Sequence, residues 1–154
     1  MKPYLSKLPF AIFALSFFAT VGSLTASEIL LLPPCDLCWW QRIFMYPIAI
    51  ITTIAIVRKE VKHFVYYVLP FSIIGWLISI YHNLLYYHIL PESLAPCQQG
   101  ISCTTKQLEW FGFFTIPLGS FLVFTFILIC SIIYSLSLRE KRSNPVQKTR
   151  SPRR

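Results

Sequence analysis

Hydrophobic residues along this chain are concentrated in four long segments, which short polar stretches separate. The segments cover residues 8–26, 43–57, 64–85 and 111–138. A helix needs about 17 to 25 residues to cross a bilayer, and only the second segment is shorter than this. That segment reaches sufficient length if its helix also takes in residues 38–42. The pattern therefore predicts an all-α polytopic membrane protein, a bundle of four transmembrane helices with two short outer loops.

The composition is also that of an integral membrane protein. Hydrophobic residues make up 55% of the 154 residues, and charged residues make up only 13%. We expect residues 1–138 to form one transmembrane domain. Residues 139–154 contain many basic and almost no hydrophobic side chains, so we expect them to form a disordered cytoplasmic tail.

Basic residues are concentrated on one side of this four-span arrangement. They are Lys2, Lys7, Arg58, Lys59, Lys62 and the cations of the tail. Only Arg42 and Lys106 fall on the other side. Because cytoplasmic loops are enriched in Lys and Arg, we predict a multi-pass cell-membrane protein with cytoplasmic termini and with both cysteine-containing loops outside. The net charge of +8 then reflects orientation and contact with membrane lipid, and we expect no nucleic-acid partner.

The first hydrophobic segment also has features of a secretory signal peptide. Lys2 and Lys7 precede it, and Gly22 and Ser23 offer small residues near a cleavage point. We expect the segment to be retained as a span. Hydrophobic character continues through residues 30–32, and retention gives the even number of spans that two cytoplasmic termini require.

The most informative chemistry is a CxxC motif, Cys35-Asp36-Leu37-Cys38, placed where a Pro-rich loop enters the second segment. Two intervening residues allow the cysteines to close a small disulfide that exchanges readily. A helix that begins near Pro34 would place both thiols at its N-terminus, where free amides and the helix dipole favour a thiolate. Arg42 follows Cys38 by four residues and so shares its helical face. The alternative for Arg42 is a cation that snorkels to the membrane surface.

A second cysteine pair, Cys97 and Cys103, lies in the other outer loop. Alone, this pair is equally consistent with a structural staple and with redox exchange. A neighbouring CxxC on the same membrane face favours exchange, because two such disulfides can form a relay. A zinc site with four cysteine ligands competes with this interpretation, but Arg42 and an oxidising compartment disfavour it, so we predict no metal. Cys130 lies among hydrophobic residues of the last segment, and we interpret it as structural.

The motif Cys35-x-x-Cys38-x-x-Gln41-Arg42, the four spans, the second cysteine pair and the segment 109–113 resemble bacterial membrane thiol–disulfide oxidoreductases of the DsbB and BdbC type. The resemblance is closest to the short BdbC branch. It implies a quinone-dependent enzyme that reoxidises an extracytoplasmic thioredoxin-like dithiol oxidase. The electrons would pass through two cysteine pairs to a membrane quinone, menaquinone or ubiquinone, and so support disulfide formation in exported proteins.

The resemblance also implies residue roles. Cys97 would react with the partner, and Cys38 would face the quinone. Arg42 would stabilise the Cys38 thiolate and the negative charge that develops on the quinone oxygen. The roles of Gln41, His82 and His88 stay open.

The chain has no Gly-rich nucleotide loop and no CxxCH haem motif, which agrees with an acceptor carried by the bilayer. Two alternatives remain open. One is a non-enzymatic membrane protein with two structural outer disulfides, and the other is a thiol relay that runs in the reducing direction.

Overall fold

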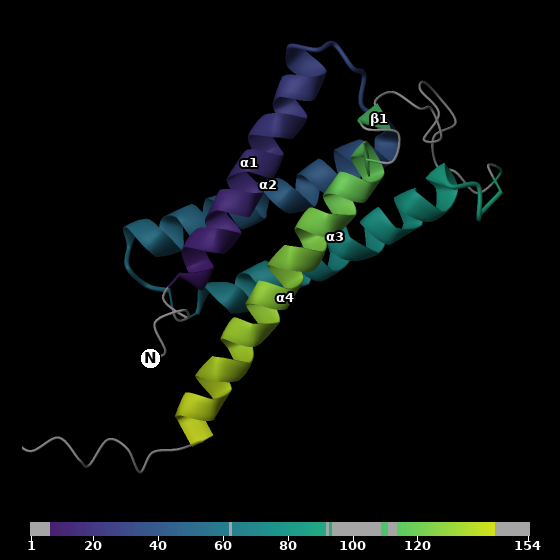
Figure 1. The fold of residues 1–154 in the computed structure, drawn as a ribbon. Coiled ribbons are helices and arrows are strands. Elements are labelled where there is room, and N and C mark those ends of the chain that lie inside the picture. The colour runs from purple at the N-terminus through teal and green to yellow at the C-terminus, as the bar shows by residue number, and fades with distance from the viewer. Residues whose placement is uncertain (1–6, 62, 92, 94–108, 111–113, 144–154) are drawn as a thin grey trace, which may run out of the picture.

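A computed structural model describes the chain except for residues 1–6, 62, 92, 94–108, 111–113 and 144–154. Its long elements are the four helices α1 (Leu8–Glu28), α2 (Asp36–Val57), α3 (Phe64–Tyr86) and α4 (Ile116–Ser143). All four are long and hydrophobic enough to cross a membrane, α4 over Ile116–Glu140. The predicted class, an all-α polytopic membrane bundle, is confirmed (Figure 1).

Helix packing places α3 between α2 and α4, while α1 packs against α2 and α4. Each helix contributes to one central core, for example through Ile12, Ile48, Val68 and Phe124, all of which are completely buried. Large hydrophobic side chains also cover the outside of the bundle. A hydrophobic exterior suits a lipid environment, because the acyl chains around it are themselves hydrophobic.

The start of α2 explains how the short second segment becomes a full span. Cys35 is the N-cap residue, in an extended conformation after two prolines, and its sulfur accepts a hydrogen bond from the Cys38 amide. Capping by a side chain satisfies one of the free amides of the first turn. The helix therefore begins next to Pro34, as predicted, and includes residues 38–42.

The start of α4 differs from the prediction. The hydrophobic segment begins at residue 111, but the helix begins at Ile116. A short antiparallel pair of strands precedes it, β1 (Glu109–Trp110) and β2 (Phe114–Thr115). The Leu118 amide donates to Thr115 Oγ1 at 3.3 Å, and Pro117 occupies the first turn. Both features favour a helix start at this point.

The other end of α4 also differs, because the helix continues to Ser143, past the domain boundary predicted after residue 138. Arg139 and Glu140 are good helix formers, so the helix need not end where the hydrophobic run ends. The division into a membrane domain and a disordered tail stays a prediction, and residues 144–154 lie outside the described part of the chain.

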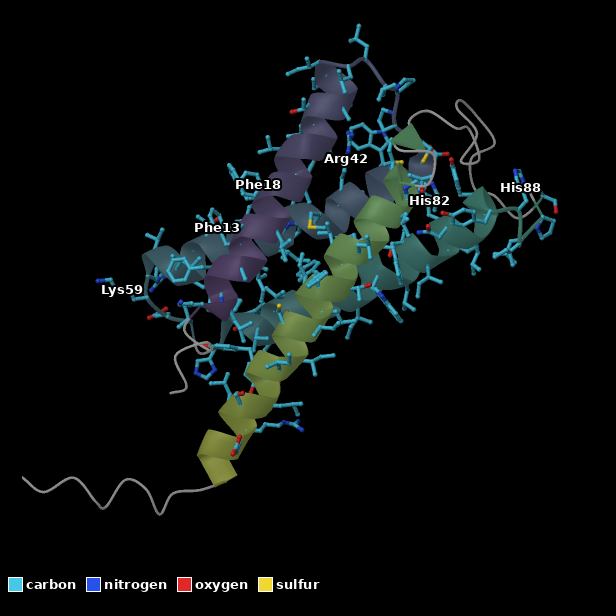
Figure 2. All side chains as sticks on the ribbon, viewed as in Figure 1. Phe13, Phe18, Arg42, Lys59, His82 and His88 are labelled. Atoms are coloured by element: carbon cyan, nitrogen blue, oxygen red, sulfur yellow. The ribbon has the colours of Figure 1, made fainter. Side chains whose placement is uncertain are left out.

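The start of α2, the end of α3 and the start of α4 gather at one end of the bundle, beside β1 (Figure 1). Asn83 joins two of these elements, because its side-chain amide donates to Ser79 O on α3 and to Pro117 O on α4. Lys59, in the connection between α2 and α3, lies at the opposite end from His82 and His88 (Figure 2).

Candidate active site

Cys35 and Cys38 lie together in the first turn of α2. Their sulfur atoms are 2.8 Å apart, and the Cys38 amide is 3.4 Å from Cys35 Sγ. A disulfide bond measures about 2.0 Å, so only a small side-chain movement separates this arrangement from a closed disulfide. Cys35 is buried, whereas Cys38 is partly exposed. The geometry supports the predicted redox pair.

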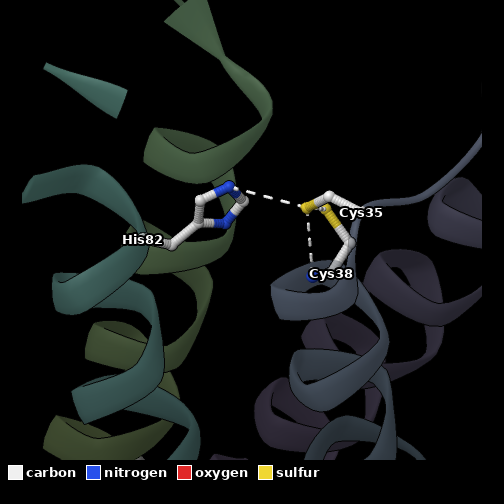
Figure 3. A group of neighbouring side chains, drawn as sticks. All are labelled: Cys35, Cys38 and His82. Carbon is white, nitrogen blue, oxygen red and sulfur yellow. Dashed lines mark hydrogen bonds between the residues drawn. The ribbon is translucent and has the colours of Figure 1, made fainter. Parts of the chain in front are cut away.

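His82 approaches the pair from α3. Its Nε2 atom lies 3.8 Å from Cys35 Sγ (Figure 3). The imidazole is almost completely buried, with 2% of its surface exposed. On its other side, the side-chain amide nitrogen of Gln41 lies 3.3 Å from His82 Nδ1. With that amide donating, the neutral ring carries its proton on Nε2 and points it at Cys35.

These contacts favour the thiolate form of Cys35. The hydrogen bond from the Cys38 side chain lowers the pKa of Cys35 most, burial opposes it, and the hydrogen bond from His82 lowers it further, to about 5. An ordinary cysteine, with a pKa of 9.0, is mostly protonated at neutral pH. The structure therefore favours the thiolate form of Cys35, which is the nucleophilic form of a cysteine.

Arg42 is buried, with 7% of its surface exposed, and its guanidinium turns toward α1. Its Nε donates to Ser23 Oγ and its Nη2 donates to Ser23 O, both at 2.8 Å. The guanidinium carbon also lies 5.3 Å from the centre of the Trp39 ring. A buried and hydrogen-bonded cation differs from the snorkelling alternative.

Arg42 shares the helical face of Cys38, as expected, but its guanidinium binds Ser23 and neither cysteine. Among the described residues, it makes no hydrogen bond to either sulfur, and its charge acts on Cys38 through space. Ser23 offers two oxygens that fit the planar guanidinium. A shared helical face fixes where a side chain starts, but it does not fix where a long side chain ends.

The second predicted pair, Cys97 and Cys103, lies outside the described residues, so its disulfide and its role stay predictions. Cys130 on α4 packs, partly buried, against the central core, which agrees with a structural thiol.

His82 and Gln41 are the site residues whose roles sequence reasoning left open. The spacing of residues along α3 could have indicated that His82 faces the inside of the bundle. The buried positions of α3 include Ser72, Gly75, Ser79, His82 and Tyr86, at the spacing of three or four residues that marks one helical face. His82 continues this stripe of small residues and therefore points into the bundle.

A four-helix membrane bundle with an exchange-capable cysteine pair at one end is the architecture of a membrane thiol–disulfide oxidoreductase. Residues 6–134 match the family model described as disulfide bond formation protein DsbB. The chain belongs to this family.

Relatives named as disulfide formation proteins support the assignment. The chain is 42% identical over 125 residues to probable disulfide formation protein C 1 of Bacillus anthracis, which covers 80% of this chain and 88% of the relative. It is 40% identical over 120 residues to disulfide bond formation protein C of Bacillus subtilis, which covers 78% and 86% respectively. The SPbeta prophage-derived disulfide bond formation protein B of B. subtilis is 38% identical over 140 residues, or 90% and 91%. No solved structure matches the chain.

Proposed function

We propose that this protein reoxidises an extracytoplasmic thioredoxin-like dithiol oxidase and passes the electrons to a membrane quinone, either menaquinone or ubiquinone. The observation that carries the proposal is the juxtaposition of Cys35, Cys38 and His82 at one end of a membrane bundle. Membership of the disulfide bond formation family supports the direction of the reaction, toward disulfides in exported proteins.

The cysteine pairs form the relay. A thiolate of the reduced partner attacks the Cys97–Cys103 disulfide, forms a mixed disulfide with Cys97 and releases the Cys103 thiolate. The partner's second thiolate resolves the mixed disulfide and leaves as the oxidised protein. The reduced outer pair then reduces the Cys35–Cys38 disulfide by the same two exchanges. Each exchange breaks one S–S bond and forms another, and two electrons move with each completed pair.

Cys35 and His82 act when the first pair is oxidised again. The Cys35 thiolate, held by His82 and the Cys38 amide, would form the bond to Cys38 as two electrons pass from the pair to the acceptor. The one remaining thiol proton, on Cys38, leaves the pair in the same step. Cys38 faces the acceptor, because it is the partly exposed member of the pair.

The polar groups near Arg42 fit a lipid-soluble acceptor that carries oxygen atoms. Ser23 occupies Nε and Nη2 of the guanidinium, which leaves Nη1 to donate elsewhere. One turn earlier on the same face of α1, the hydroxyl oxygen of Thr20 is buried without a hydrogen-bond partner in the described part of the chain. Arg42 and Thr20 would hold the quinone. When bound, it supplies an acceptor for two electrons and two protons.

The proposal places both termini in the cytoplasm and both cysteine loops outside the cell membrane. This orientation agrees with the position of His82, which lies beside Cys35 and at the opposite end of the bundle from Lys59, in the connection between α2 and α3 (Figure 2). Cytoplasmic loops are the ones enriched in such basic residues.

The decisive experiment measures quinone reduction by the purified protein with a reduced thioredoxin-like donor. We expect electron transfer that depends on Cys38 and stops in the Cys38→Ser variant. Absence of quinone reduction by the wild-type protein would favour structural disulfides. Reduction of the oxidised donor by added quinol would instead support a relay in the reducing direction.

A further inference from the structure

The three side chains of the candidate active site also form a set of metal-binding donors. Cys35 Sγ, Cys38 Sγ and a ring nitrogen of His82 all lie within 4.8 Å of one another. Cys35 and His82 are buried, and Cys38 is partly exposed. In the oxidised protein the two sulfurs are bonded to each other, but in the reduced protein both are free to bind a metal.

The distances suit zinc. Tetrahedral Zn²⁺ with bonds of about 2.3 Å to sulfur and about 2.0 Å to nitrogen places its donor atoms roughly 3.5 to 3.8 Å apart. Cys35 Sγ and His82 Nε2 already lie 3.8 Å apart. The two sulfurs, at 2.8 Å, need to separate by about 1 Å to reach this range. Cys38 can provide that movement by side-chain rotation, because it is the partly exposed member of the pair.

The charges also suit a divalent cation. Two thiolates and a neutral imidazole give a complex without net charge, which avoids the cost of a buried unpaired ion. The Arg42 cation, which would oppose a metal, directs its guanidinium to Ser23 on α1. Zinc binding therefore does not require all four outer cysteines, since His82 supplies a ligand in place of the second pair.

Gln41 provides the outer support that metal-binding histidines have. A histidine that binds through Nε2 carries its proton on Nδ1 and donates it to a second group. The Gln41 side chain lies 3.3 Å from His82 Nδ1. A half-turn of its amide group presents the oxygen to that proton, so His82 Nε2 can offer its lone pair to the metal.

We propose that the reduced protein binds one zinc ion through Cys35, Cys38 and His82, with the fourth position open, and that the ion blocks oxidation of the cysteine pair. Binding replaces the thiol protons by the metal and changes no oxidation state. The sulfurs cannot form a disulfide until the zinc leaves. This property goes beyond disulfide formation, and it would make the enzyme reversibly sensitive to extracytoplasmic zinc.

The test uses the full-length protein in detergent, with Cys97 and Cys103 replaced by serine so that the second pair cannot bind metal. Zinc is titrated into the reduced and the oxidised protein, without donor or quinone. We expect one zinc per reduced chain and none per oxidised chain. Co²⁺ in place of Zn²⁺ should show thiolate-to-metal charge-transfer absorption. Added zinc should slow oxidation of the reduced pair by a small-molecule disulfide, and a chelator should restore the rate.

Two histidine variants separate binding from folding. His82→Gln should weaken zinc binding by at least about tenfold. His63→Gln is the matched control, because His63 stacks on Tyr66 at the opposite end of α3, and it should leave the affinity unchanged. Gln41→Leu keeps all three ligands and should weaken zinc binding by about 10- to 100-fold. This variant tests the site if His82→Gln does not fold.

Several results would overturn the proposal. The first is that the oxidised and the reduced protein bind zinc equally, and the second is that the reduced protein binds none. The third is that the folded variants at positions 41 and 82 bind zinc as tightly as the control variant at position 63. None of these results depends on quinone reduction, so a failure here leaves the proposed disulfide-forming function intact.

Discussion

His82 Nε2 on α3 lies 3.8 Å from Cys35 Sγ at the start of α2, although 47 residues separate the two in the chain. The contact joins a nucleophilic sulfur to a group that can hold or move a proton. It exists because α2 begins and α3 ends at the same end of the bundle. The burial of both residues also keeps water away from the thiolate, which strengthens the interaction between them.

The contact predicts how the reactivity of Cys35 depends on pH. The folded protein lowers the pKa of Cys35 from 9.0 to about 5, so the thiolate should persist above pH 5 and be lost as the pH falls through that value. We expect alkylation of Cys35 by iodoacetamide in the reduced protein to reach its plateau below neutral pH. Mass spectrometry of the alkylated peptide over pH 4 to 9 measures this profile.

His82→Asn should move the midpoint of that profile upward, because the variant removes the hydrogen bond from His82 that favours the thiolate. His63→Asn, at the far end of α3, should leave the midpoint unchanged. A midpoint near 9.0 in the wild-type protein would show that the thiolate is not stabilised.

The helices and the position of the CxxC motif could be predicted from the sequence because both depend on local signals. Long hydrophobic runs specify spans, and Pro34 followed by Cys35 marks a helix start. The start of α4 could not be predicted in this way, because hydropathy alone does not distinguish a short strand from a helix. The hydrophobic run begins at residue 111, but Thr115 provides the cap.

The contacts of the site required the structure. Ser23 and Arg42 are 19 residues apart, and Gln41 and His82 are 41 residues apart, so each contact depends on how two helices pack. The helical register of Arg42 correctly placed it one turn from Cys38. It did not reveal that Ser23 on α1 binds the guanidinium.

The packing of α3 against α4 depends on the absence of a side chain at Gly75. A Cβ atom at this position would collide with the ring of Phe124, with Cδ1 at 2.8 Å, and that ring is completely buried, so moving it would disturb its packed neighbours. Gly75→Ala should lower the free energy of unfolding by about 1 to 3 kcal/mol. Thermal unfolding in detergent measures the change. Combining it with Phe124→Leu should recover part of the loss, whereas additive losses would argue against this contact.

The proposed orientation predicts which cysteines react from outside the cell. Single-cysteine versions of the protein at positions 35 and 97 should react with membrane-impermeant thiol reagents on intact, reduced cells, because the proposed orientation has both positions on the outer side of the membrane. A cysteine introduced in place of Ser151 should react only after the cells are opened. The reverse pattern would place the active site in the cytoplasm.

The proposed relay predicts a trapped intermediate. Cys103→Ser removes the outgoing thiol of the second pair, so Cys97 should accumulate in a mixed disulfide with an extracytoplasmic thioredoxin-like protein. Non-reducing electrophoresis followed by mass spectrometry identifies the linked peptide. If no complex forms, and cells that lack all four outer cysteines oxidise their secreted proteins normally, the disulfides are structural.

Arg42 allows the sharpest test of the acceptor site. Arg42→Met should keep the fold, since an unbranched hydrophobic side chain suits the membrane boundary, but it should weaken quinone use. Loss of a charge-assisted contact where negative charge develops costs on the order of 2 to 4 kcal/mol, or roughly thirty-fold to several hundred-fold in rate. Arg42→Lys should rescue only partly, because lysine keeps the charge without the planar set of donors.

Ser23→Ala separates the chemistry of Arg42 from its role in joining α1 to α2. This variant removes the hydroxyl that accepts from Nε and keeps the backbone oxygen that accepts from Nη2. We expect a loss of less than about tenfold in quinone reduction, since one hydrogen bond to the charged group remains. The measurement is the rate at saturating dithiol donor over a range of quinone concentrations, with thermal unfolding as the control for folding. Unchanged kinetics in a folded Arg42→Met variant would restrict Arg42 to joining the two helices, and the quinone would have to bind elsewhere.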